Sequence, residues 1–126
     1  MLFNSILQLE KSGHNIVLII TSKVEQYQYE KKEEDFLELA KELGIDFLLT
    51  EKLNSTKTYE FIRKTVPDIA ISVNWKTLIP HECMNLFPYG ILNAHAGDLP
   101  RFKGNAVRNW ALVSGEESMS LTIHEM

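Results

Sequence analysis

An asparagine and a histidine two positions apart, Asn93 and His95, are the residues of this sequence whose types and spacing best suit chemistry. They follow the apolar pair Ile91 and Leu92, which is typical of a buried strand. On an extended chain, residues two apart point to the same side, so we expect the amide and the imidazole to lie together. An amide can donate to a developing oxyanion, and an imidazole can donate or share a proton near neutral pH. The pair therefore suits attack on a carbonyl-like carbon.

The polar stretch from Ala94 to Gly104 is expected to be a loop that follows this pair. Leu99 and Pro100 restrain its turn, because proline fixes one backbone angle and limits the residue before it. Gly104 allows the backbone to approach a ligand closely. Spacing alone leaves a structural interpretation open, since an Asn-x-His pair is often a hydrogen-bonded feature without a catalytic role.

Apolar runs and amphipathic segments alternate along the chain and must position this loop. Continuous β-branched runs predict buried strands, and apolar residues at helical spacing predict helices between them. The strands are expected at 16–20, 47–49, 69–73, 91–93 and 119–123. The helices are expected at about 2–9, 36–43, 54–66, 78–87 and 106–113. His124 alternates with apolar neighbours on a strand and is interpreted as structural.

Local signals predict where several of these helices begin and end. Gly44 follows the last apolar position of the second helix and is expected to end it. Asn54 or Ser55 is expected to cap the third helix, and Asn105 the last one.

Apolar side chains on the helix faces predict the core. Tyr59, Ile62 and Val66 should form the buried face of the third helix. Trp110 is expected in the core under the last helix. Cys83 is interpreted as a small buried residue, because no activating base lies near it in the sequence.

Helices that alternate with short apolar strands predict an α/β fold: an open, mostly parallel, Rossmann-like sheet with helices on both faces. Ligands of such sheets bind beyond the carboxyl ends of the strands, where the loop after Asn93 lies. The 126 residues are the length of one domain. No spacing of potential ligands predicts a metal site.

Composition narrows the function class. The formal net charge of −4 gives no basic footprint for nucleic acid or an anionic membrane. No apolar run approaches the roughly 20 residues that span a bilayer, and the start lacks the pattern of a signal peptide. The single cysteine excludes an internal disulfide and fits a reducing compartment, so we expect a cytoplasmic protein.

The run from Ile91 to Met126, ILNAHAGDLPRFKGNAVRNWALVSGEESMSLTIHEM, resembles the signature of the formyltransferase family. The hallmark of that family is Asn-x-His, a short linker, Leu-Pro, a basic-aromatic patch and glycine. The closing Ile-His-Glu-Met is also similar, and a weaker resemblance runs back to Gly13. The family includes enzymes that act on methionyl-tRNA, on glycinamide ribonucleotide and on nucleotide-linked amino sugars, together with a hydrolase of formyltetrahydrofolate.

The resemblance implies a donor, an acceptor and a set of contacts. The donor would be 10-formyltetrahydrofolate, and an acceptor amine would attack its formyl carbon. Asn93 and protonated His95 would stabilise the oxyanion of the tetrahedral intermediate. The residues implied for the folate are Trp75, Lys76, Thr77, Leu78, Leu99 and Gly104. The segment 97–100 is more similar to the sugar and transfer-RNA branches than to the purine branch, so we expect a sugar amine or an aminoacyl-tRNA as acceptor.

The sequence departs from the family pattern in two places, so we expect a catalytic domain truncated at both ends. Family members open with a strand before the first helix, which would lie centrally in the sheet and which this chain lacks. They also carry a catalytic aspartate on a loop that would fall beyond Met126. Asp98 and Glu125 are the nearest carboxylates, and neither sits at that position. We therefore expect slow turnover, or none, from this chain alone.

Two alternatives to a formyltransferase remain open at this stage. Water could replace the amine, which would make the protein a formyltetrahydrofolate hydrolase. The chain could be a non-catalytic fragment that binds folate. A homodimer is also compatible with the sequence.

Overall fold

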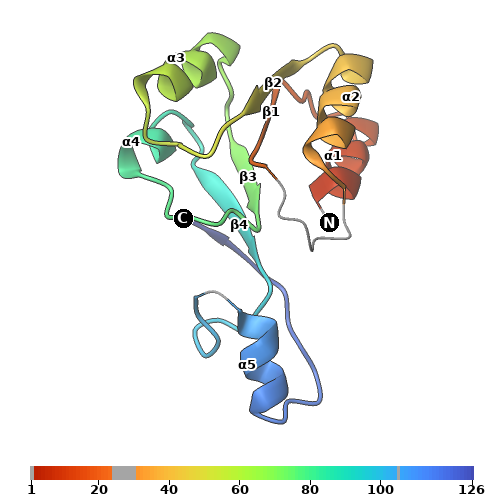
Figure 1. The fold of residues 1–126 in the computed structure, drawn as a ribbon, viewed down its shortest axis with the longest axis vertical. Helices are drawn as coiled ribbons and strands as arrows, with labels where there is room; N and C mark the ends of the chain where they lie inside the picture. Colours follow the sequence, from red (N-terminus) through yellow and green to blue (C-terminus); the bar gives the residue numbers. More distant parts are fainter. Residues whose placement is uncertain (1, 24–30, 105) are drawn as a thin grey trace.

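The computed structural model describes residues 2–23, 31–104 and 106–126, and helices alternate with strands along them (Figure 1). In chain order the elements are α1 (Leu2–Lys11), β1 (Leu18–Thr21), α2 (Glu33–Leu43), β2 (Asp46–Leu49), α3 (Thr56–Thr65), β3 (Ala70–Val73), α4 (His81–Met84), β4 (Ile91–His95), α5 (Val107–Val113) and β5 (Thr122–Glu125). This order confirms the predicted α/β class.

The strands form two small sheets among the described residues. β1 pairs with β2 in parallel, and β3 pairs with β4 in parallel. β5 adds to the far edge of β4 in the antiparallel direction. β1 and β3 are therefore both edge strands, and no strand pairing joins the two sheets among the described residues. The pairing is mostly parallel, as predicted.

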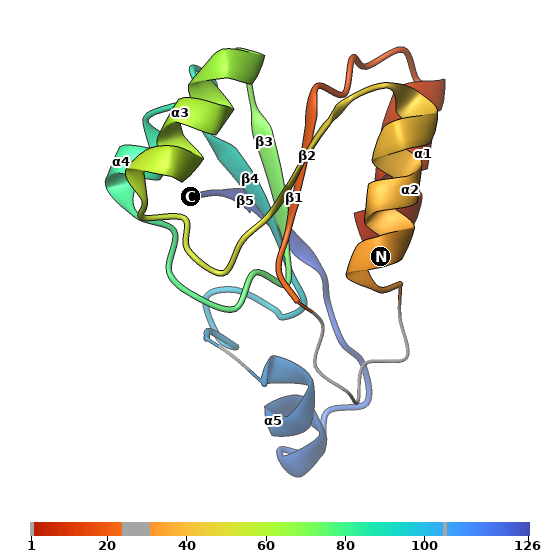
Figure 2. The ribbon, with the colours of Figure 1, turned by 45° about the horizontal axis from the view of Figure 1, so that its top comes forward.

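Helices cover both faces of the strands (Figure 2). On one face, Ile19 of β1 packs with side chains of α1 and α2. Leu18 and Ile20 point the other way and pack with the cluster that α3 and α4 cover, which includes the fully buried Ile62. This alternation follows from the two-residue period of a strand, and it explains why the β1 run is apolar throughout.

Two local signals in the sequence set helix boundaries as predicted. The Ser55 hydroxyl accepts a hydrogen bond from the Thr58 backbone N–H at 3.2 Å, which makes Ser55 the cap of α3. Gly44 ends α2 in the left-handed conformation with φ of 67°, which costs glycine little because it lacks a Cβ.

Other boundaries and burial predictions were wrong. Val66 is 79% exposed, because α3 ends before it and its own backbone turns left-handed. Trp110 is 62% exposed, because the described residues bury a neighbouring side of α5, at Val107 and Ala111. The helix predicted over 78–87 is only the four-residue α4. The predicted cap Asn105 lies outside the described residues.

The strands that carry Asn93, His95 and His124 also have bounds that differ from the predicted ones. β4 continues to His95, two residues beyond the predicted end, so both Asn93 and His95 belong to the strand itself. The last strand is Thr122–Glu125 and not 119–123. α5 and the segments on either side of it form a lobe beyond the carboxyl end of β4 (Figure 1). No helix in the described part of the chain is long and apolar enough to cross a membrane.

Candidate active site

Asn93 and His95 lie on one face of β4, at its carboxyl end. The antiparallel register sets Asn93 opposite His124 and His95 opposite Thr122. Directly paired residues share a face of the sheet, so all four side chains lie on the same side. Asn93 and His95 are both partly buried. The prediction that the amide and the imidazole lie on the same side is therefore confirmed.

Asn93 is held by a side chain of the neighbouring strand. Its Nδ2 lies 3.1 Å from Nε2 of His124. Nδ1 of His124 lies 2.9 Å from the Glu125 carbonyl oxygen, which can only accept, so Nδ1 carries the hydrogen. In the neutral ring Nε2 is then an acceptor, and Asn93 donates to it. The second amide hydrogen and Oδ1 of Asn93 have no hydrogen-bond partner among the described residues.

His95 is held by the loop that follows it. Its Nε2 lies 2.7 Å from the Phe102 carbonyl oxygen, so Nε2 carries a hydrogen and donates it. Nδ1 has no partner in the described part of the chain. The rings of His95 and His124 meet edge to face, with centroids 6.4 Å apart. One nitrogen of His95 is thus anchored, and the other keeps its hydrogen-bonding capacity unused among the described residues.

Gly97 lets the loop fold back onto His95. A Cβ at this position would lie 2.9 Å from Nε2 of His95 and 2.8 Å from the Phe102 carbonyl oxygen. It would also lie 2.6 Å from a methyl group of Val107. These distances are shorter than van der Waals contact, and one of the atoms belongs to the backbone. Only glycine therefore permits the loop to approach His95 in this way.

The Thr122 hydroxyl ties the same loop to β5. It donates to the Gly97 carbonyl oxygen at 2.7 Å and accepts from the Leu99 backbone N–H at 3.4 Å. Thr122 is also the cross-strand partner of His95. One side chain therefore joins the strand pair to the loop that orients the imidazole.

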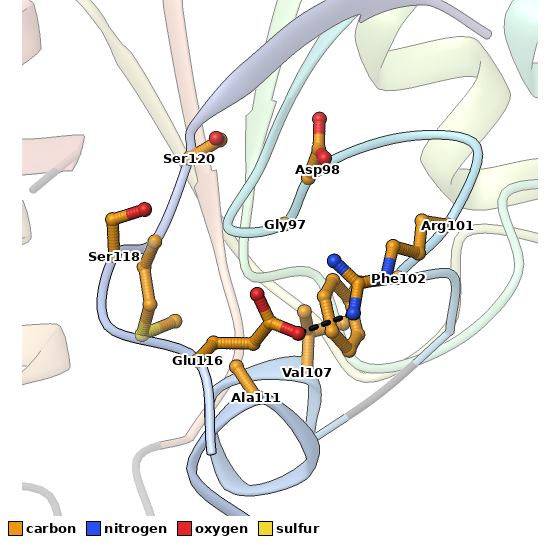
Figure 3. Close-up of a pocket in the computed structure, with 10 residues that line it drawn as sticks. Gly97, Asp98, Arg101, Phe102, Val107, Ala111, Glu116, Ser118 and Ser120 are labelled. Carbon is orange, nitrogen blue, oxygen red and sulfur yellow. Dashed lines mark hydrogen bonds and ion pairs between the residues drawn. The ribbon is translucent and has the colours of Figure 1, made fainter. Parts of the chain in front are cut away.

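A hollow of about 340 Å³, part of it open to solvent, lies beside this loop (Figure 3). Gly97 and Phe102, which both contact His95, form part of its wall. Glu116 forms an ion pair with Arg101, whose guanidinium also lies 4.8 Å from the centre of the Phe102 ring. The hollow is polar, and it adjoins His95 on the side of the loop.

The residues expected to bind folate are spread over two regions. Trp75 packs on the apolar cluster under α3 and α4, and its Nε1 donates to Thr77 Oγ1 at 3.0 Å. Lys76 and Thr77 are exposed, and Leu78 is 93% exposed. Trp75 also lines an apolar cleft between β1 and β3, which none of the other folate candidates lines.

The remaining folate candidates lie in the loop after β4. Leu99 is partly buried and anchored to Thr122. Gly104 has φ of 82°, with open space where a Cβ would stand, so its backbone conformation requires glycine. Leu99 therefore lies in the loop beside His95, whereas the segment 75–78 lies after the end of β3.

Neither nearby carboxylate contacts the imidazole. Glu125 is cross-strand to Leu92, so it lies on the opposite face of the sheet from His124, and its side chain lies against Gly90. Asp98 lines the hollow, but no hydrogen bond or ion pair joins it to His95 in the part of the chain that the structure describes. Neither residue therefore orients His95 in this structure.

The buried thiol is kept inactive by its surroundings. Cys83 is 2% exposed, and burial raises the pKa of its thiol, which favours the unreactive neutral form. No group of three or more histidine, cysteine, aspartate or glutamate residues could hold a metal ion among residues 2–23, 31–104 and 106–126.

Three residues of this site were missed by reasoning from sequence. His124 was interpreted as structural, and Gly97 and Thr122 were given no role. The closing Ile-His-Glu-Met pattern was a signal for His124, but its pairing with Asn93 spans 31 residues of sequence. Gly97 gave no signal beyond its residue type, because its role depends on three atoms that the fold brings around it.

The sequence profile of the family described as formyl transferase matches residues 2–126. The chain belongs to the formyl transferase family. Solved structures that this family member resembles include glycinamide ribonucleotide transformylase 1 from Symbiobacterium toebii, with 22% identity and a TM-score of 0.74 over 98% of this chain and 59% of that one. Another is phosphoribosylglycinamide formyltransferase from Anaplasma phagocytophilum, with 18% identity and a TM-score of 0.75 over 98% of this chain and 58% of that one.

A third similar structure is glycinamide ribonucleotide transformylase 1 from Geobacillus kaustophilus, with 18% identity and a TM-score of 0.73 over 98% of this chain and 66% of that one. At these identities the likeness establishes a shared fold. This formyl transferase family member spans about three-fifths of the length of the first and second of these structures.

Proposed function

We propose that this chain carries the core of a folate-dependent formyltransferase, which moves a formyl group from 10-formyltetrahydrofolate to an amine. The observation that carries the proposal is the pair Asn93 and His95 on one face at the carboxyl end of β4. Each of the two keeps polar atoms without a partner among the described residues. Membership of the formyl transferase family supports the same reaction class.

Asn93 and His95 are proposed to stabilise the oxyanion of this reaction. The amine nitrogen attacks the formyl carbon, a carbon–nitrogen bond forms, and the carbonyl electron pair moves onto oxygen. The second amide hydrogen of Asn93 donates to that oxyanion. His95, held at Nε2 by the Phe102 carbonyl, donates from Nδ1 when its ring is protonated. The attacking amine loses one proton, and collapse of the intermediate expels the folate nitrogen, which takes up one proton, so that a formamide and tetrahydrofolate are left.

The folate is proposed to lie along the segment 75–78 and the loop after β4. Leu78 supports this position, because it is 93% exposed and a flat ring would cover its apolar side chain. Trp75 could pack its aromatic face on the pterin. Leu99 would border the formyl end, since its backbone is anchored to the strand that carries His124.

The acceptor is proposed to be the amine of a sugar or of an aminoacyl-tRNA. The order of residues at 97–100 supports these branches. The similar structures carry names that indicate a different acceptor, glycinamide ribonucleotide. A panel with one acceptor of each class therefore separates the possibilities.

The test is a single-turnover assay with the 126-residue protein in excess over 10-formyltetrahydrofolate labelled in the formyl group. Excess protein is used because no carboxylate contacts His95 in the described residues, so we expect turnover to be slow. Asn93→Ala and His95→Ala should each slow transfer by about 100- to 1000-fold, since each removes one oxyanion donor. Glu117→Gln, at an exposed position of the lobe, is the matched control and should leave the rate unchanged.

Several outcomes would count against this proposal. Equal transfer rates for the parent protein and Asn93→Ala would show that the Asn93 amide does not take part in the reaction. Formate release without an acceptor, at the rate of donor loss, would identify a hydrolase. Tight binding of 5-formyltetrahydrofolate with no labelled product from any acceptor would identify a folate-binding fragment.

A further inference from the structure

His124 accepts a hydrogen bond from Asn93, and a backbone carbonyl determines which of its two ring nitrogens is the acceptor. Nδ1 of His124 donates to the Glu125 carbonyl oxygen at 2.9 Å, so the neutral ring has its lone pair on Nε2. That nitrogen lies 3.1 Å from Nδ2 of Asn93. The two residues are direct partners in the β4–β5 pairing, so the backbone of both strands sets their separation.

This contact distinguishes between the two orientations of the Asn93 amide. A rotation of 180° would bring Oδ1 against Nε2 of His124, and two lone pairs would then face each other. The observed orientation points the amide nitrogen at His124 and leaves its second hydrogen for another acceptor. An asparagine without such a neighbour could present either its oxygen or its nitrogen to the formyl group, and only the nitrogen stabilises an oxyanion.

We propose that His124 is a positioning residue that sets the amide orientation of Asn93 through the lone pair on Nε2. This inference rests on the proposed formyl transfer for its catalytic consequence. His124 need not touch the folate or the amine. Its hydrogen bond to Asn93, and the edge contact of its ring with His95 at 6.4 Å between centroids, link the two proposed catalytic groups through one side chain.

Three substitutions separate this role from simple packing. His124→Gln keeps a hydrogen-bonding group near the position of Nε2, and His124→Asn keeps one only near Nδ1. His124→Phe keeps the ring and removes both nitrogens. We expect His124→Phe and His124→Asn to lower the single-turnover rate constant about tenfold to a hundredfold, as misplacement of a reacting group does, with the dissociation constant for 5-formyltetrahydrofolate changed by less than about threefold. His124→Gln should restore most of the rate.

A spectroscopic measurement tests the positioning without any turnover. Long-range ¹H–¹⁵N spectra should show His124 protonated at Nδ1 and not at Nε2 when the ring is neutral. The side-chain amide resonances of Asn93 should shift in His124→Phe and return toward their original positions in His124→Gln.

The two sets of results decide different questions. The positioning role would be overturned, at any level of activity, if the neutral His124 ring were protonated at Nε2. It would also be overturned if the Asn93 amide resonances did not change in His124→Phe. An equal fall in the single-turnover rate constant for His124→Gln and His124→Phe, or a change confined to the dissociation constant for 5-formyltetrahydrofolate, would also overturn it. The expected spectra together with no formyl transfer by the parent protein would support the amide orientation and defeat only the proposed function.

Discussion

Asn93 and His95 are two residues apart on one strand, yet different kinds of structure hold them. A cross-strand side chain, His124, holds Asn93 within the regular β4–β5 pairing. A loop carbonyl, that of Phe102, holds His95 from outside the sheet. Backbone hydrogen bonds along both strands determine the first contact, whereas a few contacts of an irregular segment determine the second.

The difference indicates which changes each half of the site tolerates. The Asn93 half depends on the chemistry of one nitrogen and should respond to small changes in hydrogen-bonding groups. The His95 half depends on the absence of a side chain at Gly97 and on the Thr122 hydroxyl. We therefore expect the loop half to be broken by added volume at Gly97 or by loss of the Thr122 hydroxyl, and the strand half by loss of the hydrogen-bond acceptor on His124.

The largest effect is expected from Gly97→Ala. The added methyl group would meet the Phe102 carbonyl oxygen at 2.8 Å, so the loop must move away from His95. Overpacking of this kind should lower the free energy of unfolding by about 1–3 kcal/mol, as measured by urea denaturation. The ring resonances of His95 should shift at the same time. Glu117→Gln, at an exposed position of the same lobe that does not line the hollow, is the control and should change neither quantity.

If Gly97→Ala were as stable as the parent protein and left the His95 resonances in place, the loop would not depend on that close approach. The contrast between the two halves of the site would then disappear.

A smaller effect is expected from Thr122→Val, which keeps the shape and removes the hydroxyl. The Leu99 N–H and the Gly97 carbonyl oxygen would each lose a partner, which should lower the free energy of unfolding by about 1–2 kcal/mol. Thr122→Ser retains the hydroxyl and should lose less. Urea denaturation of the three proteins makes the measurement, and equal stability of Thr122→Val and the parent would show that the hydroxyl does not hold the loop.

Features that depend on neighbouring residues were predictable from the sequence. Ser55 and Gly44 act through their own backbone and the next few residues, so the residue types alone indicated where α3 begins and α2 ends. The shared face of Asn93 and His95 followed from the period of an extended strand. These are local rules, and the structure confirms them.

Features that depend on distant residues were not predictable in the same way. Trp110 has an apolar side chain at helical spacing, but its burial depends on whether another element packs against that side of α5. The pairing of Asn93 with His124 depends on the register of two strands joined by the loop and α5. A pattern read along one strand contains no information about that register.

The most direct test of the central claim is a chemical-shift comparison with two folates. The account predicts that 10-formyltetrahydrofolate shifts the Asn93 side-chain amide and the His95 ring resonances, and that tetrahydrofolate, which lacks the formyl group, shifts them much less. Identical shifts with both folates, or shifts that leave these two residues unaffected, would contradict it.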